Sequence, residues 1–330
     1  MAIIEAAHTH APEVDARDAA LALAIAERDA ALADAKFLRE YMNSARSYLA
    51  HVAEAAVAED LEVATDPPVA HGPPERTSLG TPAHVQHPVS VIQVLHKDSP
   101  LRNRLLATLP PDDLGRLEPH LALVRLRAGE TLFQPEVPIR YVYFPETAVV
   151  SLVSRLGGRG SVEVGTTGYE GMVGLPVFLA ADTSTSEALA QIPGTARRME
   201  AETFVRLAKA PGAFHHALLR YTQAFLTQVA QTAVCNTAHL VEERCARWLL
   251  MTRDRVNGNQ FPLKYEFLAF MLAVRIGGVM MAMRRLQSAG LVRYDHERVS
   301  IVDRGGLEAA ACECYGVVRA HFDRLLPAGG

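Results

Sequence analysis

The segment that most constrains the fold of this chain is residues 261–302, FPLKYEFLAFMLAVRIGGVMMAMRRLQSAGLVRYDHERVSIV. Apolar residues recur at helical spacing on both sides of a short break at Ala273-Val274, and Gly290 follows as an expected helix C-cap. Two short strand-like runs then flank a polar turn at 295–298. This order of helix, turn, helix and hairpin is typical of a winged helix-turn-helix, a DNA-reading module. A small helical subdomain with a β-ribbon is the alternative.

Charge is distributed unevenly along the 330 residues. Residues 1–70 hold 5 Lys and Arg against 13 Asp and Glu, a balance of −8, whereas residues 237–302 hold 10 against 6, a balance of +4. A basic segment that coincides with the winged module suits a phosphate-binding surface. An ordinary solvated surface is the alternative, because a balance of +4 is modest.

The candidate DNA-binding residues are the cations of this segment: Lys264, Arg275, Arg284, Arg285, Arg293, His296 and Arg298. Arg275 is the expected base reader, and the others are expected to contact phosphates, which position a protein without specifying a sequence. Adjacent Arg284 and Arg285 cannot both face the groove. The remaining base-reading positions offer no hydrogen bonds to a base edge, since they are Ile276, Gly277, Gly278, Met280 and Met281. The sequence therefore predicts weak or low-specificity DNA binding.

Composition divides the chain into five segments and predicts an α+β fold. Residues 1–66 are Ala-rich and helical or coiled-coil-like, and residues 67–95 form a Pro-rich linker. Residues 96–212 carry short β-rich runs between turns, which predict a β-roll or jelly-roll sensor domain. Residues 213–236 form a dimerisation helix, and residues 237–330 form the winged helix-turn-helix domain. The strands are expected at Leu121–Leu126, Tyr141–Phe144, Val149–Leu152 and Val162–Val164, and the last helix at Leu307–Leu325.

The helix expected over residues 213–236 carries one apolar stripe, which contains Leu218, Tyr221, Phe225, Val229 and Ala233. We expect this stripe to be a dimer seam, because sequence-specific regulators usually read two-fold DNA sites as two-fold dimers. Packing of the helix on its own β-roll is the alternative.

This order of parts, together with certain segments, resembles the Crp/Fnr family of bacterial transcription regulators. The segments lie within residues 100–322 and are similar to a subgroup other than the cyclic-AMP-binding founder: Val142–Pro145, Ser161–Gly165, Gly168–Gly174, Gln228–Ala233, Ala246–Met251 and Glu308–Tyr315. The resemblance implies a β-roll sensor domain, a long dimer helix and a C-terminal winged helix-turn-helix. The function that it implies is that of a homodimeric DNA-binding transcription regulator.

The candidate effector pocket is the turn made up of Gly171, Met172, Val173 and Gly174. Family members that bind cyclic AMP carry a Glu in this region and an Arg further along, but no Arg occurs here between Thr183 and Gln191. A cyclic phosphate without a cationic partner would bury an unpaired charge. The departures from the family pattern therefore imply a β-roll that does not bind cyclic AMP.

No cofactor or metal is expected. An iron–sulfur cluster normally needs four thiolates, and none of the four cysteines precedes residue 235. Cys312 and Cys314 lie two apart on an expected helix and would point about 200° apart. Cys235 and His239 share a helix face, but two ligands are too few for a structural zinc site. His215 and His216 are candidate haem ligands, although solvated helix histidines are the favoured interpretation.

Residues 38–49 carry a second, weaker resemblance, to the phosphoacceptor helix of one histidine-kinase class. Asn43 stands where a His would be expected, and Asn cannot accept a phosphoryl group as His does. Two interpretations stay open for this helix: a plain helical tail, or a seam that dimerises or binds RNA polymerase or another protein.

Two functions remain open on the sequence alone. The first is a homodimeric regulator whose partners are DNA and a second copy of the chain, and the alternative is an interaction or scaffold protein with a degenerate DNA-reading helix. We do not expect an enzyme, because no nucleophile motif or phosphate-cradling loop stands out. No apolar run approaches the roughly 20 residues of a membrane span, and no signal peptide opens the chain, so we expect a cytoplasmic protein.

Overall fold

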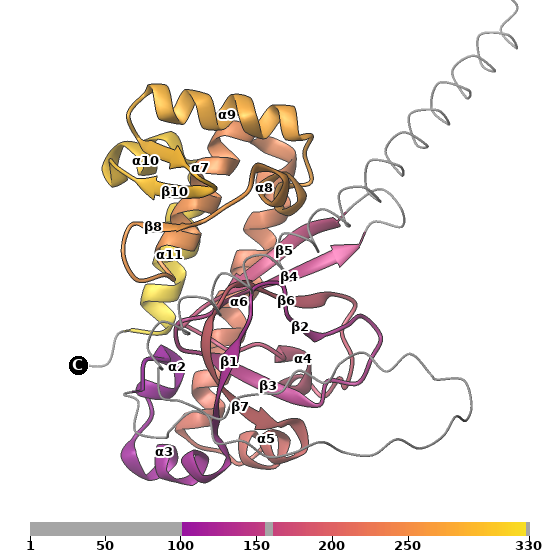
Figure 1. The fold of residues 1–330 in the computed structure, drawn as a ribbon. Helices are drawn as coiled ribbons and strands as arrows, with labels where there is room; N and C mark the ends of the chain where they lie inside the picture. Colours follow the sequence, from indigo (N-terminus) through magenta and orange to yellow (C-terminus); the bar gives the residue numbers. More distant parts are fainter. Residues whose placement is uncertain (1–100, 156–160, 328–330) are drawn as a thin grey trace, which may run out of the picture.

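The computed structural model describes residues 101–155 and 161–327, so the predictions for residues 1–66 and 67–95 lie outside the described residues. The described part consists of a β-roll with short helices, a long helix, and a smaller helical module with a three-stranded sheet (Figure 1). The expected α+β fold is confirmed for these residues. The long helix α6 (Ala213–Ala238) runs along the β-roll and continues toward the C-terminal module.

The β-roll consists of two antiparallel sheets, ordered β1-β7-β3 and β2-β6-β4-β5. The four predicted strands are present, and most extend beyond their predicted ends because backbone pairing continues where the side-chain pattern fades. The elements of this part are α2 (Arg104–Ala107), α3 (Pro111–Leu117), η1 (Glu118–His120), β1 (Ala122–Leu126), β2 (Thr131–Phe133), β3 (Tyr141–Pro145), β4 (Val149–Arg155), β5 (Ser161–Thr167), α4 (Leu175–Phe178), β6 (Glu187–Ile192), β7 (Gly194–Glu200) and α5 (Ala201–Ala208).

Aromatic packing fixes α6 against the β-roll. The rings of Phe144, Phe204 and Phe214 come from β3, α5 and α6, and their centroids lie 5.9–6.4 Å apart. All three side chains are buried, with exposed fractions of 5% or less. Such aromatic contacts contribute about 0.5–1.5 kcal/mol each beyond area burial. One face of α6 therefore belongs to the hydrophobic core of its own chain.

The C-terminal module has the predicted helix, turn, helix and hairpin, and adds one strand that the sequence did not reveal. Its sheet is ordered β8-β10-β9, and the added strand is β8. Three residues are too few to show an alternating pattern, which explains why β8 was missed. The elements are α7 (Val241–Arg253), β8 (Gln260–Pro262), α8 (Tyr265–Leu272), α9 (Ile276–Ser288), β9 (Val292–Asp295), β10 (Arg298–Ile301), α10 (Arg304–Ala310) and α11 (Cys314–Leu325).

The prediction of a single last helix over Leu307–Leu325 is wrong. Helix α10 ends at Ala310, and Ala311 has an extended backbone with ψ of 155°. Helix α11 begins only at Cys314. The helical composition continues through the break, so the side-chain pattern gives no sign of it. Cys312 therefore lies in the turn between two helices, and Cys314 opens the second.

The turn between α8 and α9 is sharp. The two helices are bent by 111° at this break, and Ala273 occupies it with a left-handed φ of 50°. Any residue other than Gly is strained there, at a cost of about 1 kcal/mol. Within residues 101–155 and 161–327, no single helix is long and apolar enough to cross a membrane, and this bent pair alone has the required length and composition when taken together.

Candidate DNA-binding face and signal-receiving region

Helix α9 lies at the edge of the module with one side open to solvent (Figure 1). Val279, Met283 and Leu286 anchor its other side in the core, with exposed fractions of 1% or less. Ile276 is half-buried against the same core, and Gly278 is half-buried near Val241. Two of the five apolar positions expected to face bases are therefore partly used in packing.

The exposed surface of α9 is mostly without hydrogen-bonding side chains. Met281 is 59% exposed, Met280 is 37% exposed, and Gly277 is exposed with open space where a Cβ would be. Arg275 precedes this surface as the N-cap residue, and Arg284 lies exposed one turn beyond the methionines. The guanidinium groups thus flank an apolar centre on the side of α9 that faces solvent.

The structure separates the seven candidate cations into two groups. Arg285 pairs with Glu242 of α7 at 3.1 Å, and Lys264 pairs with Glu297 at 3.2 Å. The two adjacent arginines of α9 therefore differ in their contacts, because Arg285 turns toward α7 and Arg284 does not share that contact. Arg285 stays exposed despite its ion pair, and exposed His296 lies 2.8 Å from Asp295. The other exposed candidates are Arg275, Arg284, Arg293 and Arg298.

The wing carries Arg293, His296 and Arg298, and His296 lies at its tip. His296 and Glu297 have φ of 45° and 57°, and β9 and β10 pair on either side of them. Positive φ at both central residues is the signature of a type I′ hairpin turn, which matches the twist of its strands. The wing is fixed to the helices because the Tyr265 and Tyr294 rings stack with centroids 4.2 Å apart. It therefore has a defined position beside α9.

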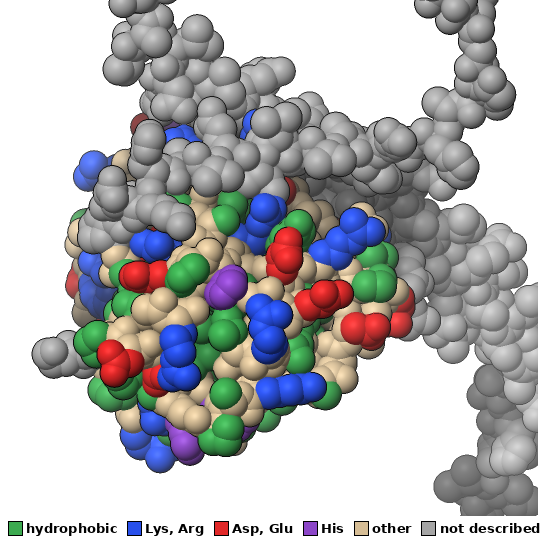
Figure 2. Space-filling model, turned by 90° about the horizontal axis from the view of Figure 1, so that it is seen from below, with side chains coloured by type: hydrophobic (Ala, Val, Ile, Leu, Met, Phe, Trp, Pro, Cys, Tyr) green, Lys and Arg blue, Asp and Glu red, His purple; other side chains and the backbone are tan. Residues whose placement is uncertain are grey.

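The opposite end of the molecule has a mixed surface. Figure 2 views the protein from below, away from α9, and shows Lys and Arg side chains interspersed with Asp, Glu and apolar groups. Arg116 and Asp113, for example, form an ion pair on α3 within a single turn. Alternating signs cancel at distances beyond about 10 Å at ordinary salt. A phosphate-binding surface is therefore better placed at the α9 end.

The structure contradicts the predicted dimer seam at three positions. Leu218, Tyr221 and Phe225 have exposed fractions of 0%, 1% and 8%, because they pack inside the core of their own chain. Val229 is half-buried, and only Ala233 is exposed. The sequence pattern located an apolar stripe correctly, but it could not say which partner the stripe contacts. The alternative, packing on the protein's own β-roll, is the one that the structure supports.

The turn predicted as an effector pocket is closed. Gly171, Met172, Val173 and Gly174 are all buried, and Val173 exchanges backbone hydrogen bonds with Tyr143 at 2.7 and 2.9 Å. Tyr221 fills the space beneath the turn, and its hydroxyl donates to the Met172 carbonyl at 2.8 Å. A Cβ at Gly171 would collide with the Tyr221 ring. The turn is therefore part of the core.

Two larger cavities lie elsewhere in the described part of the chain, and the predicted pocket residues line neither of them. One of about 890 Å³ lies on the β-roll between the α4 region and α5, with Arg140, Lys209 and His215 among its lining residues. The other, of about 280 Å³, lies where the β-roll meets the C-terminal module and is lined by Arg104, Arg304 and other residues. These two cavities have the space that a small molecule would need to bind.

A buried polar network joins the β-roll to α7, and sequence reasoning missed it. Ser151 Oγ lies 2.5 Å from Glu163 Oε2 and 2.8 Å from Gln191 Oε1, and Gln191 Nε2 donates to Thr252 Oγ1 at 3.1 Å. Burial raises the pKa of Glu163 from 4.5 to about 7, against the opposing effect of the Ser151 hydrogen bond. Alternating polar residues on strands normally face solvent, so their pattern offers no reason to place these side chains in the core.

A buried ion pair makes a second connection between the same parts. Arg255 Nε donates to Glu170 Oε1 at 2.7 Å, and both side chains are only 8% exposed. Arg255 also donates to the Met251 carbonyl, and Glu170 accepts the Gly168 N–H at 3.1 Å. The Gly-rich turn after β5 is thereby fixed to the residue just beyond α7. Because of this ion pair, a movement of the turn would also displace residues of the C-terminal module.

Four potential metal ligands converge near the end of α6. We refer to Cys235, His239, Cys312 and Cys314 as the cysteine–histidine cluster, whose ligand atoms all lie within 4.8 Å of one another. The sequence predicts no metal site here, because Cys235 and His239 alone are too few ligands and Cys312 and Cys314 are expected to point apart on a helix. The expected helical geometry of Cys312 and Cys314 is wrong, because Cys312 precedes α11. A hydrogen bond from Cys312 lowers the pKa of Cys235, while burial opposes this effect.

Comparison with known proteins agrees with the geometry of the C-terminal module. Residues 243–310 match the family model described as a Crp-like helix-turn-helix domain. The chain contains a Crp-like helix-turn-helix domain, called the Crp-type domain below. The described part as a whole has the fold of Crp/Fnr-family transcription regulators. None of the curated proteins compared with the chain matches it.

Two solved structures support the fold. FixK2 from Bradyrhizobium japonicum is 17% identical, with a TM-score of 0.51 over 58% of this chain and 98% of its own. A regulator from Eubacterium rectale assigned to the crp/fnr family is 13% identical, with a TM-score of 0.50 over 61% of this chain and 94% of its own. At these identities the similarity concerns the arrangement of the β-roll, the long helix and the Crp-type domain.

Proposed function

We propose that this protein is a homodimeric transcription regulator that binds DNA through its Crp-type domain with weak base selectivity. The observation that carries the proposal is α9, an exposed helix with cations at both ends and a wing beside it. A helix of this kind fits the major groove, and the wing cations fit the adjoining phosphates.

Weak selectivity follows from the chemistry of the exposed side of α9. Gly277, Met280 and Met281 offer no donor or acceptor to a base edge. Each good bidentate contact between a side chain and a base contributes about 1–3 kcal/mol of discrimination. Arg275, at the start of α9, is the expected base reader, while the wing cations would add affinity without sequence information. We therefore expect DNA binding that is sensitive to salt and has little sequence preference.

The dimer seam that we propose keeps Ala233 but otherwise lies one or two residues after the positions that the sequence predicted. Helix α6 exposes Leu219, Leu226 and Val234, with exposed fractions of 47%, 53% and 48%. Six exposed positions of α6 follow a heptad pattern. Three of them occupy one core position of the heptad, and each is followed four residues later by the second core position: Leu219, Gln223, Leu226, Ala230, Ala233 and Thr237. Alternating steps of four and three are those of a two-stranded coiled coil. A second copy of the chain is the partner that such a seam fits.

A charge in this seam is expected to separate the dimer. In Leu226→Glu, two carboxylates would face each other near the two-fold axis, and their desolvation and repulsion oppose association. We expect sedimentation equilibrium to show a dimer for the natural chain, and at least a tenfold weaker self-association for the variant. Leu179→Glu, at an exposed apolar position on the β-roll, is the matched control and should remain dimeric. Equal self-association of both variants would contradict this seam.

We propose that the β-roll receives a signal other than a cyclic nucleotide. The predicted pocket turn is filled by Tyr221, and the turn itself is tied to Arg255 through Glu170. The same ion pair, with the Ser151–Glu163 network, gives a route from the β-roll to the Crp-type domain. A signal would act by favouring one placement of this domain, to the extent that it binds one state more tightly.

DNA binding tests the proposed function. We expect fluorescence anisotropy to show that the full chain binds random duplexes at low salt, with log affinity falling linearly as log salt rises. Arg298→Ala, which removes a wing cation, should reduce that slope by about 1 for each phosphate that the variant protomer no longer neutralises. Arg116→Ala, on the opposite face, should bind as the natural chain does. Absence of binding at low salt would refute the regulator and leave the scaffold protein as the better explanation.

A further inference from the structure

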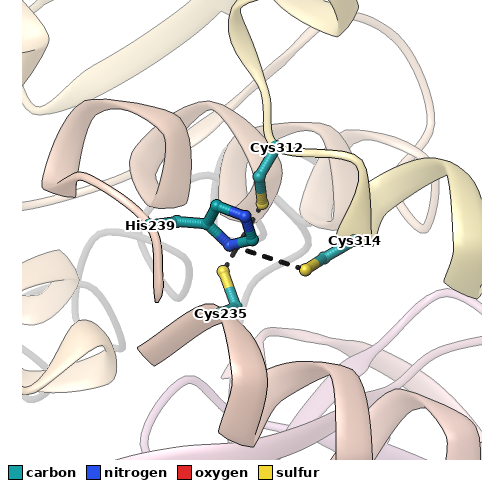
Figure 3. Close-up of side chains that lie close together, drawn as sticks. All are labelled: Cys235, His239, Cys312 and Cys314. Atoms are coloured by element: carbon teal, nitrogen blue, oxygen red, sulfur yellow. Dashed lines mark hydrogen bonds between the residues drawn. The ribbon is translucent and has the colours of Figure 1, made fainter. Parts of the chain in front are cut away.

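Two segments far apart in the sequence bring three thiols and an imidazole to one point. Cys235 lies in the last turn of α6 and His239 caps that helix, while Cys312 and Cys314 bracket the turn before α11. Figure 3 shows the three sulfur atoms and the imidazole ring pointing toward a common centre. The cysteines have exposed fractions of 1–5% and form a small cluster separate from the main core.

The spacing of the ligand atoms suits a single tetrahedral ion. Cys235 Sγ lies 3.5 Å from Cys312 Sγ, and Cys314 Sγ lies 3.7 Å from His239 Nδ1. Zinc–sulfur bonds of about 2.3 Å in a tetrahedron place neighbouring sulfurs roughly 3.8 Å apart. A multi-iron cluster would hold its thiolates farther apart than these atoms lie. The geometry therefore points to one mononuclear ion with no open coordination position.

An outer carboxylate orients the imidazole for this role. His239 Nε2 lies 3.2 Å from a Glu313 carboxylate oxygen, so this nitrogen donates and Nδ1 is left facing the sulfurs. Histidines that ligate metals almost always donate their other ring N–H to such a partner. Glu313 belongs to the same turn as Cys312 and Cys314. The outer hydrogen bond thus comes from the segment that supplies two of the thiols.

Buried cations of α7 offset the charge that a filled site would carry. Three thiolates, a neutral imidazole and a divalent ion leave one net negative charge. Arg244 donates to Asn236 at 2.9 Å and Arg247 donates to Thr232 at 3.0 Å, so both reach α6 beside Cys235, and each is only 7% exposed. The Nε atoms of both have no hydrogen-bond partner among the described residues. Cationic groups of this kind favour thiolates, the form in which cysteine binds metals.

We propose that the cysteine–histidine cluster binds one Zn²⁺ ion in a closed, structural site. The ion would join the C-terminal end of α6 to the turn between α10 and α11. That turn belongs to the C-terminal module, so the ion would attach the module to α6. Its consequence for DNA binding rests on the proposed function, because the ion would then set the angle between the dimer seam and α9. Metal binding itself is independent of that function.

Metal content and affinity of the full chain test the proposal. Protein purified under reducing conditions should contain one Zn²⁺ per chain, and Co²⁺ in its place should show the absorption of a tetrahedral thiolate complex. Glu313→Gln keeps all four ligands and should weaken Zn²⁺ binding about 10- to 100-fold in chelator competition. Cys314→Ser should bind more weakly still. Cys245→Ala removes the buried cysteine outside the cluster and should bind as the natural chain does.

Three results would overturn the proposal. The first is reduced, folded protein that takes up no stoichiometric Zn²⁺ or Co²⁺. The second is Zn²⁺ affinity that Glu313→Gln leaves unchanged, a result that stands even if Cys314→Ser fails to fold. The third is a Cys235–Cys312 disulfide in freshly prepared protein that excludes the ion, since these sulfurs are also near enough to pair after a small movement. Because no DNA enters these measurements, their failure would be distinct from failure of the proposed regulator.

Discussion

Replacing Arg255 with Met is expected to lower the free energy of unfolding by about 3–5 kcal/mol. The variant leaves the Glu170 carboxylate buried beside an apolar side chain, and a buried charge without a partner is costly. Urea unfolding followed by circular dichroism measures the change. Arg116→Met is the matched control, since Arg116 is 66% exposed and its ion pair should contribute no more than about 1 kcal/mol.

A double-mutant cycle isolates the ion pair from the loss of packing. Glu170→Gln retains an acceptor for the Gly168 N–H but removes the charge, so combining it with Arg255→Met should cost less than the two single changes added together. Additive costs would show that the pair is not coupled and would contradict its role in joining the β-roll to the Crp-type domain.

Glu163→Gln is expected to make the protein less sensitive to pH and more stable above neutrality. Burial raises the pKa of Glu163 from 4.5 to about 7, so the folded chain holds a proton that the unfolded chain releases between these values. Stability from this group is therefore greatest below about pH 4.5 and falls until about pH 7, above which the loss is complete. Each pKa unit corresponds to about 1.4 kcal/mol, which makes the total about 3 kcal/mol.

Unfolding measured at several pH values checks this expectation. The difference in stability between Glu163→Gln and the natural chain should grow by about 2.5 kcal/mol from about pH 5 to about pH 8. The amide offers both a donor and an acceptor to the Ser151 hydroxyl, so a hydrogen bond between the two residues is retained. Glu118→Gln, at an exposed position, should follow the natural chain. Parallel pH profiles for Glu163→Gln and the natural chain would contradict a protonated, buried Glu163.

Local patterns predicted the Crp-type domain because its helices and wing are defined by nearby residues. The periodicity of α8 and α9, the break at Ala273 and the polar turn at the wing tip are all visible within 42 residues. The positive φ of Ala273 and of the wing turn agrees with the positions where the sequence placed turns. Strands of the β-roll were found in the same way, from short β-branched runs.

The sequence predictions were wrong where the role of a surface depends on what that surface packs against. An apolar stripe on α6 indicates that something covers it, but Leu218 and Tyr221 contact their own β-roll while Leu219 and Leu226 face solvent. One residue of displacement turns a helix by about 100°, which is enough to exchange these two faces. The α10–α11 break was missed because Ala and Cys suit a helix as well as a turn.

The site residues that sequence reasoning missed are joined by long-range contacts. Glu170 and Arg255 are 85 residues apart, and Cys235 and Cys312 are 77 apart. Each half of the cysteine–histidine cluster, taken alone, has too few ligands for a metal site. Only the tertiary fold brings the two halves together. Spacing within a short motif predicts a metal site, whereas ligands brought together by two separate helices give no local pattern.

Selection from a random pool of duplex DNA by the full chain most directly tests weak base selectivity in the Crp-type domain. At about 0.15 M salt, repeated rounds should enrich no strongly preferred two-fold site, and affinity for selected and unselected duplexes should differ by less than about 100-fold, below the range typical of specific binders. Ile276→Arg should add up to about 1–3 kcal/mol of discrimination if its guanidinium reaches a guanine. Enrichment of one two-fold sequence by the natural chain, bound roughly 1,000-fold or more tighter than random DNA, would contradict the proposal.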